Sequence, residues 1–321
     1  MIDASSVRES SCMRRFFWTV VGGYREKIPS NDMVFGSAFH KFAEVLEATG
    51  GNLAASLLEA KAIYQPENYK MKSKKQYMND VYLIKVCMDF YLKEWIPAQE
   101  NLTGFHVLKL NGAPLVEKKF ALPFYTCDQF DILLCGTIDK LGRIGTSGVY
   151  SIADYKTTSS WDKEEYFNSY LLDPQFNVYS LVIHKLAVQF PTSLFAEMVA
   201  GRLSYFIEGI FLKSDGVTFQ RSDVMHVKKE RLMVFEAMLN KLVARLATEI
   251  TVWLAAGEPD DTTYIPSEGE LNGACKTVYG SCKFFNACAA PDSVATGHVL
   301  RNNYKREQYN PLLFGSVTTK K

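Results

Sequence analysis

The stretch Val149 to Thr158, Val-Tyr-Ser-Ile-Ala-Asp-Tyr-Lys-Thr-Thr, predicts a buried strand that ends in one carboxylate and one amine. Successive side chains of a strand point to opposite sides, so Asp154 and Lys156 share a face and Tyr155 points away from them. A second apolar run, Ile132 to Asp139, also delivers an acid at its end. If the two strands are neighbours, Asp139, Asp154 and Lys156 meet at one place.

This combination of charged side chains is typical of a metal-dependent hydrolytic site. Two carboxylates hold a hard divalent cation through oxygen, and a nearby lysine can orient or protonate a water. Taken alone, each acid also fits a turn former or a helix cap. Burying two acids at adjacent strand ends without a cation is costly, so the joint pattern favours a metal site.

The bulk composition indicates an ordinary folded protein. The chain has 321 residues, of which 47% are hydrophobic and 22% charged, and its net charge is +1. Any polyanion site must therefore come from local clustering of basic residues. The N-terminus shows no secretory signal, no uncharged run reaches the ~20 residues that a membrane span needs, and the seven cysteines indicate a reducing compartment. We expect a cytoplasmic protein with no membrane partner.

Hydrophobic periodicity predicts a mixed α/β fold. Helices lead in, an antiparallel meander of four strands follows, and a crossover helix leads to further strands and a long helix. We expect one domain over residues 1–321, with a helical part (1–100), a catalytic core (101–222) and a cysteine-rich C-terminal part (223–321). The expected helices are Ser5–Val21, Val34–Ala48, Leu53–Ile63, Tyr77–Trp95 (stopped by Pro97), Asp173–Val188 and Val224–Ala256, and the expected strands are Phe105–Leu110, Leu115–Leu122, Phe130–Arg143, Gly148–Thr157, Leu203–Lys213 and Val217–Arg221.

Five short motifs occur in an order that resembles the PD-(D/E)xK nuclease superfamily, in particular its RecB-like exonuclease branch. The resemblance spans residues 36 to 179 and implies a restriction-endonuclease-like core, a mixed central sheet flanked by helices, with a helical insertion. The motifs are Gly-x-x-x-His at Gly36 and His40, a strand glutamate at Glu117, Gly-x-Ile-Asp at Gly136–Asp139, Asp-x-Lys at Asp154–Lys156 and Gln-x-x-x-Tyr at Gln175 and Tyr179.

The resemblance also implies a role for each matching residue. Asp139, Asp154, His40 and the backbone carbonyl of Tyr155 would bind Mg²⁺ or Mn²⁺, an imidazole being better suited to Mn²⁺. Lys156 would orient the attacking water and offset transition-state charge. Gln175 and Tyr179 would position Lys156 and the phosphate. Glu117 would take a supporting or outer metal role.

Each of these residues also has an ordinary structural interpretation. Without the other motifs, His40 would be taken for a core histidine that has found a hydrogen-bond partner. Gln175 and Tyr179 would belong to an ordinary helix surface. The order of the five motifs favours the functional interpretation.

Four cysteines stand at the two ends of the chain. Cys12 lies near the N-terminus, and Cys275, Cys282 and Cys288 lie in the C-terminal tail. This distribution resembles the iron–sulfur staple of AddB-like and CRISPR-associated RecB-like exonucleases and implies a [4Fe–4S] cluster joining the termini. The tail of those proteins begins Cys-x2-Cys, whereas this one begins with six intervening residues. Zn²⁺ on the four cysteines and four unligated thiols are the alternatives.

Basic residues form two groups that suit a nucleic-acid backbone. Arg14 and Arg15 lie in the first expected helix, and Lys72, Lys74 and Lys75 precede the helix at Tyr77. A solvated loop explains the lysines equally well.

Together these features predict a metal-dependent deoxyribonuclease. The resemblance implies an exonuclease that acts on single strands or duplex ends in recombination, repair or DNA processing, in a bacterial, archaeal or phage-infected cell. The alternatives are an endonuclease and a structural or DNA-end-binding subunit of a recombination complex. The chain has no phosphate-binding loop, so it would not drive ATP-dependent unwinding itself, and the sequence is compatible with a recombination or helicase partner without requiring one.

Overall fold

The computed structural model divides the chain into two compact units. It describes residues 1–71, 75, 77–101, 104–145, 148–257, 264–277 and 280–307. Among these residues, unit 1 comprises those of 1–27, 120–136 and 229–307, and unit 2 comprises those of 28–119 and 137–228.

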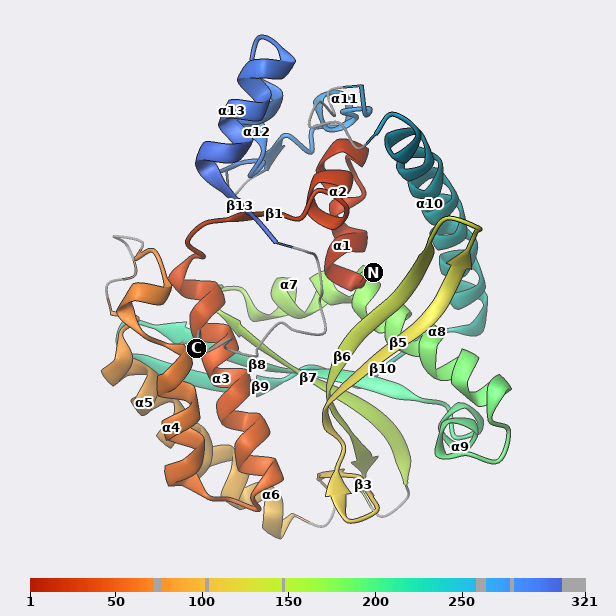
Figure 1. Ribbon diagram of the computed structural model, residues 1–321. Coiled ribbons are helices and arrows are strands. Elements are labelled where there is room, and N and C mark those ends of the chain that lie inside the picture. Colours follow the sequence, from red (N-terminus) through yellow and green to blue (C-terminus); the bar gives the residue numbers. More distant parts are fainter. Residues whose placement is uncertain are drawn as a thin grey trace. The chain divides into compact units, whose positions relative to one another are not determined.

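The elements follow one another in a mixed α/β order (Figure 1). The helices are α1 (Ala4–Glu9), α2 (Met13–Val20), α3 (Asn31–Ala48), α4 (Leu53–Ile63), η1 (Pro66–Asn68), α5 (Asp80–Phe90), the π-helical η3 (Tyr91–Trp95), α6 (Ile96–Glu100), α7 (Lys163–Asn168), η4 (Ser169–Leu172), α8 (Pro174–Gln189), α9 (Leu194–Ala200), α10 (Lys229–Ala255), α11 (Gly269–Asn272), α12 (Phe285–Cys288) and α13 (Ser293–Asn303). The strands are β1 (Tyr24–Glu26), β2 (Phe105–Val107), β3 (Lys109–Leu110), β4 (Ala113–Pro114), β5 (Val116–Thr126), β6 (Asp131–Ile144), β7 (Val149–Thr158), β8 (Ser204–Lys213), β9 (Gly216–Arg221), β10 (Met225–His226), β11 (Lys276–Thr277), β12 (Gly280–Ser281) and β13 (Tyr304–Arg306).

A mixed sheet is the framework of unit 2. Its strand order is β10-β8-β7-β6-β2, with β5 added on β6 and β9 added on β8. β6 and β7 are antiparallel, and Lys140 pairs with Ala153. β7 and β8 are parallel, because α7, η4, α8 and α9 form the crossover between them. This mixed sheet flanked by helices confirms the predicted restriction-endonuclease-like fold class.

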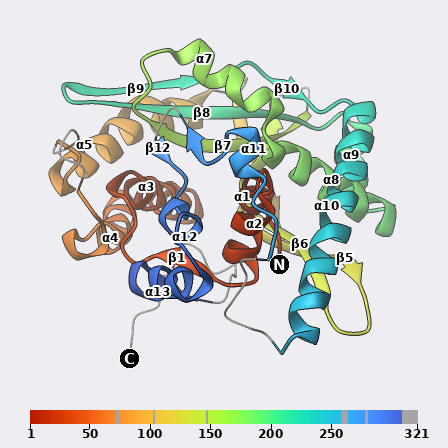
Figure 2. The same cartoon turned by 90° about the horizontal axis from the view of Figure 1, so that it is seen from above.

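Helices cover both faces of the β7–β8 pair, as Figure 2 shows for α3 and α7. On one face, Ile210 and Leu212 enter a core formed with α3, α4 and α5. On the other face, the rings of Phe167 from α7 and Phe211 meet edge to face, with centroids 5.7 Å apart. Only a glycine at 209 admits this packing, because a Cβ there would lie 3.0 Å from the Phe167 ring.

Helix α3 buries one apolar face against this sheet. Its buried residues recur every three or four positions, the period of a helix. Gly36 allows the close approach of α3 to β7, since a Cβ at that position would lie 3.1 Å from Oγ1 of Thr157. His40 follows one turn later and contacts Asp139 of β6 and the backbone of Tyr155 in β7.

Unit 1 is built around aromatic side chains of α2. Phe17 meets Trp253 of α10 at 5.8 Å, and Trp18 meets Phe284 at 5.2 Å, both edge to face. Ile2 joins this unit through an isolated bridge to β6, in which its amide donates to the carbonyl of Leu133 at 2.8 Å. Residues near the two termini thus share one unit, and β1 pairs with β13 within it.

Several predicted boundaries were wrong for identifiable reasons. The helix expected over Ser5–Val21 is two helices, because α2 starts anew after Cys12. Pro97 does not stop the helix before it. It lies in the first turn of α6, where a missing amide hydrogen is tolerated, after the π-helical turn Tyr91–Trp95.

Two further corrections concern long-range pairing. Only part of the expected meander forms: β5 pairs with β6 and β6 with β7, whereas β2 pairs with β6 instead of with β5. The helix expected from Val224 starts at Lys229, since Met225 pairs with Tyr205 of β8. α13 was missed, although Asp292 caps it by accepting from the amide of Ala295 at 2.8 Å.

Within the described ranges, no helix combines the length and apolar character that crossing a bilayer requires.

Candidate metal and catalytic site

The ends of β6 and β7 bring together the two acids and the lysine singled out from the sequence. Asp154 is fully buried and Asp139 nearly so, with 0% and 8% exposed. The Asp139 carboxylate accepts from the amide of Tyr155 at 2.9 Å. Lys156 forms an ion pair with Asp154. The alternation of side chains along β7 therefore places these charges on one face of the sheet.

His40 and Glu117 complete this group. Nδ1 of His40 lies 3.2 Å from Oδ2 of Asp139 and 3.7 Å from Oε1 of Glu117. Its Nε2 donates to the carbonyl oxygen of Tyr155 over 3.0 Å. Among the residues the structure describes, His40, Glu117 and Asp139 form the one set of three ligand atoms that lie within 4.8 Å of one another. The Tyr155 carbonyl, an expected metal ligand, is here the acceptor that fixes the ring of His40.

Helix α8 supplies the remaining motif residues, Gln175 and Tyr179, one turn apart. Nε2 of Gln175 donates to Oδ1 of Asp154 at 2.6 Å and to the hydroxyl of Tyr179 at 2.8 Å. The Tyr179 hydroxyl in turn donates to the carbonyl of Thr137 at 2.5 Å. The chain of hydrogen bonds fixes Asp154 from the side opposite Lys156, so α8 is not an ordinary helix surface here.

The electrostatics of this site favour an additional positive charge. Burial and the neighbouring Asp139 raise the pKa of Asp154 to about 6. Burial also raises the pKa of Asp139, and Glu117 adds to the effect. For His40, burial lowers the pKa, but the carboxylates of Asp139 and Glu117 outweigh it and raise the pKa to about 9. In the metal-free protein a proton on His40 therefore sits between two carboxylates.

This donor set fits a divalent cation. Nε2 of His40 carries the hydrogen that bonds Tyr155, so the lone pair of Nδ1 faces Asp139 and Glu117. Only a proton or a cation can occupy that position without repulsion. One imidazole and two carboxylates suit Mn²⁺ and, less well, Mg²⁺. His40, Glu117 and Asp139 could hold such an ion beside Asp154 and Lys156.

Tyr166 and Tyr170, which the motif search did not single out, also approach this site. Their hydroxyls lie 3.0 Å apart. The charges of Lys156 and Asp154 act on the hydroxyl of Tyr170, whose pKa is raised chiefly by burial. These tyrosines lie in the segment between β7 and α8, where no periodicity marks them in the sequence.

Comparison with known proteins now identifies the family. The family model of the PD-(D/E)XK nuclease superfamily matches residues 8–289. The chain belongs to the PD-(D/E)XK nuclease superfamily. No curated protein matches the sequence. Among solved structures, a candidate exonuclease from Eubacterium rectale is similar, with 13% identity over 80% of this chain and 82% of that chain and a TM-score of 0.42, a likeness too low to bear on activity.

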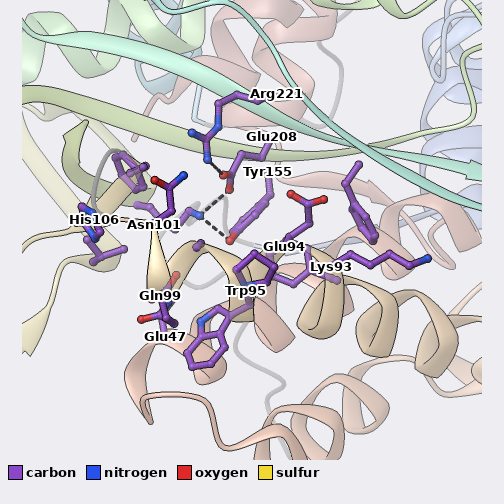
Figure 3. A pocket seen from close by; sticks show the side chains of 18 of the residues that line it. Glu47, Lys93, Glu94, Trp95, Gln99, Asn101, His106, Tyr155, Glu208 and Arg221 are labelled. Carbon is purple, nitrogen blue, oxygen red and sulfur yellow. Dashed lines mark hydrogen bonds and ion pairs between the residues drawn. The ribbon is translucent and has the colours of Figure 1, made fainter. Parts of the chain in front are cut away.

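The face of the nuclease sheet opposite Asp139 and Asp154 carries a second charged network beside a cavity of about 560 Å³ (Figure 3). Nζ of Lys140 donates to the hydroxyl of Tyr155 and to Glu208, both at 2.6 Å. Arg221 contacts the other oxygen of Glu208 at 2.8 Å. Here the one carboxylate contacts two cations, so its negative charge is compensated within the chain.

The four cysteines of the predicted staple gather in unit 1 as thiols. Burial raises the pKa of Cys275, and the neighbouring thiols of Cys282 and Cys12 raise it further. Burial also raises the pKa of Cys288, and Cys12 adds to that rise. Gly269 lies between two of them, because a Cβ there would lie 3.0 Å from Sγ of Cys275 and 3.4 Å from Cβ of Cys12. The three other cysteines, Cys87, Cys127 and Cys135, are free thiols elsewhere.

The predicted nucleic-acid contacts are engaged in structural interactions where the structure describes them. Nε of Arg14 donates to the carbonyl of Ile265 at 2.9 Å. Arg15 pairs with Glu9 at 2.7 Å, and Lys75 with Asp32 at 2.8 Å. Lys72 and Lys74 lie outside the described residues.

Proposed function

We propose that this nuclease is a Mg²⁺- or Mn²⁺-dependent exonuclease of the RecB-like branch that hydrolyses DNA phosphodiesters on single strands or at duplex ends. The observation that carries the proposal is the convergence of His40, Glu117 and Asp139 beside the Asp154–Lys156 pair. A structural site would balance these charges within the chain, as the Lys140 network does. This one gathers three carboxylates around His40 and Lys156.

Each residue of the site has a defined task in this proposal. His40, Glu117, Asp139 and Asp154 hold the ion, which when bound polarises the phosphate and acidifies a water. Lys156 orients that water and offsets the negative charge that develops on the phosphate oxygens. Its pKa is lowered by burial but raised more by Asp154 and Asp139, so Lys156 stays protonated at neutral pH. Gln175 and Tyr179 keep Asp154 in place.

The cleavage assay that tests this function uses end-labelled linear single-stranded DNA with Mn²⁺, next to a circular single strand and the Asp154→Ala variant. Loss of the linear strand alone, absent in the variant, supports the exonuclease, and the label position gives its polarity. Cutting of the circle moves the assignment to an endonuclease. Cleavage of neither contradicts the proposal and favours a DNA-end-binding subunit that works with a recombination or helicase partner in DNA repair.

We further propose that Cys12, Cys275, Cys282 and Cys288 hold a [4Fe–4S] cluster, as the resemblance to the stapled exonucleases implies. The thiols' mutual influence and the absence of a side chain at Gly269 support a shared ligand. Such a cluster absorbs visible light and contains four iron atoms. Metal analysis of anaerobically purified protein and of Cys282→Ser tests it. Zinc in place of iron, or neither, would contradict the cluster.

A further inference from the structure

The segment that joins β7 to α8, residues 159–173, exposes large apolar side chains next to the proposed catalytic site. Trp161 and Leu172 are each 79% exposed, and Leu171 is 42% exposed. Tyr166 and Tyr170 lie between them in the sequence, half-buried. We call Trp161, Tyr166, Tyr170, Leu171 and Leu172 the aromatic shelf.

The shelf is fixed from beneath by packing and hydrogen bonds. The ring of Tyr166 meets that of Phe211 in β8 edge to face at 5.4 Å. Asp162 caps α7 by accepting from the amide of Glu165 at 2.8 Å, and the amide of Ser160 donates to Oγ1 of Thr158 at 3.0 Å. Exposure of Trp161 and Leu172 therefore comes from an ordered segment.

The shelf is continuous with the site along the chain and in space. Its first residue follows β7 shortly after Lys156, and its last residue immediately precedes Asp173, the cap of the helix that carries Gln175. Lys156 and Tyr170 act on each other electrostatically. A strand of nucleic acid whose phosphate lies at Lys156 would therefore pass over the shelf.

Cations accompany the aromatic rings. Nζ of Lys213 lies 4.5 Å from the centroid of the exposed Trp161 ring, and Nζ of Lys163 lies 5.2 Å from that of Phe211, which is buried beneath the shelf. Exposed rings with neighbouring ammonium groups are how proteins bind unpaired nucleic acid, because bases stack on the rings while cations contact phosphates. A paired duplex end would not offer its bases to these rings.

We propose that the aromatic shelf stacks the bases of the single-stranded substrate next to the scissile phosphate, so that unpaired strands are preferred. The inference rests on the proposed nuclease function and adds its substrate class. Trp161 and Leu172 supply the base contacts, whereas Lys163 and Lys213 contact the backbone.

Binding without cleavage tests the shelf separately from the catalytic proposal. Full-length Asp154→Asn protein is titrated, with EDTA present, into fluorescein-labelled oligo-dT, an abasic strand of equal length and a blunt hairpin. Adding Trp161→Ala should weaken oligo-dT binding roughly 5- to 150-fold, the effect of one lost base stack. Abasic binding should not change, since that strand keeps only the phosphates. Leu172→Ala should show the same pattern with a smaller loss.

Phe190→Ala is the matched control, because Phe190 is an exposed aromatic at the far end of α8. It should leave all three affinities unchanged. Equal weakening of oligo-dT and abasic binding by Trp161→Ala, or no weakening of either, would overturn the shelf and assign its exposed surface to a protein partner. A base-dependent loss in a protein whose wild type cleaves nothing would keep the shelf and reject the nuclease function. Oligo-rU in parallel distinguishes RNA from DNA.

Discussion

The two faces of the same strands, β6 and β7, handle buried charge in opposite ways. On one face, the carboxylates of Asp139 and Asp154, with Glu117 beside them, outnumber Lys156 and the protonated His40. The pKa of Asp154 is raised to about 6 by burial and by Asp139. On the other face, Lys140 and Tyr155 alternate with these acids along the strands, and Glu208 joins them from β8. Burial raises the pKa of Glu208, but Lys140 and Arg221 outweigh it and lower the pKa overall.

The two faces thus separate charges that stabilise the fold from charges that suit the binding of a cation. A balanced network is maintained by the protein alone, and breaking it leaves an uncompensated buried charge. An unbalanced cluster destabilises the free protein and is useful only when a cation arrives. Four experiments sharpen this distinction, in order of decreasing expected effect.

Asp154→Asn should reduce cleavage by roughly a thousandfold or more, since it removes a proposed metal ligand and the partner of Lys156. Its melting temperature in EDTA should not fall, because the raised pKa of Asp154 means that the charged form is disfavoured in the folded protein. Cleavage assays and thermal unfolding check both parts. A large loss of stability would place Asp154 with the structural charges.

Glu208→Gln should have the opposite profile and lower the free energy of unfolding by about 3–5 kcal/mol, because Lys140 loses its buried counter-charge. Since the pKa of Glu208 is lowered, its contribution is present above the unfolded-state pKa and is lost as pH falls. The variant should therefore lose less stability on acidification than the wild type. Urea unfolding at several pH values measures this.

The control for this experiment is Glu59→Gln, a change at an exposed glutamate of α4. It should leave the unfolding free energy and its pH dependence unchanged. If Glu208→Gln changed the unfolding free energy as little as this control, the network of Lys140, Glu208 and Arg221 would not be a source of stability.

Mn²⁺ should stabilise the wild type by about 2.7 kcal/mol when its concentration is a hundred times its dissociation constant. EDTA should reverse the effect. Asp139→Asn should abolish it, because Asp139 belongs to the set of three converging ligands. A thermal shift of equal size in the variant would show that the ion binds elsewhere.

Tyr179→Phe should give the smallest effect, a loss of about 1 kcal/mol in stability. The hydroxyl accepts from Gln175 and donates to the carbonyl of Thr137, and the variant removes both bonds. Activity should fall severalfold through misplaced Asp154. An unchanged rate would show that Gln175 holds Asp154 without this support.

Strand alternation and motif order predicted much of the site. The period of two placed Asp154 and Lys156 on one face, and the i, i+4 spacing placed Gln175 beside Tyr179. The pairing of strands far apart in the chain was harder to predict from the sequence. Nothing in the local pattern of β2 says that it pairs with β6 and not with β5, the next strand along the chain. The aromatic shelf was invisible for a similar reason, since a connecting segment has no period.

Glu117 shows a different limit. The resemblance implied a supporting or outer metal role for Glu117, and its carboxylate lies within 4.8 Å of the ligand atoms of His40 and Asp139. Alternation along β5 does not say where a residue with a left-handed backbone directs its side chain. Its φ is +47°, in the region that glycine favours.

At position 117 the requirements of stability and of the proposed metal site conflict. A non-glycine residue there costs of the order of 1 kcal/mol, whereas glycine would relieve the strain and remove a carboxylate from the converging set. A selection or design scheme that rewards only thermal resistance should therefore replace Glu117 with glycine and yield a sturdier, inert protein. Retention of glutamate under such selection would show that its side chain stabilises the protein by more than the backbone strain costs.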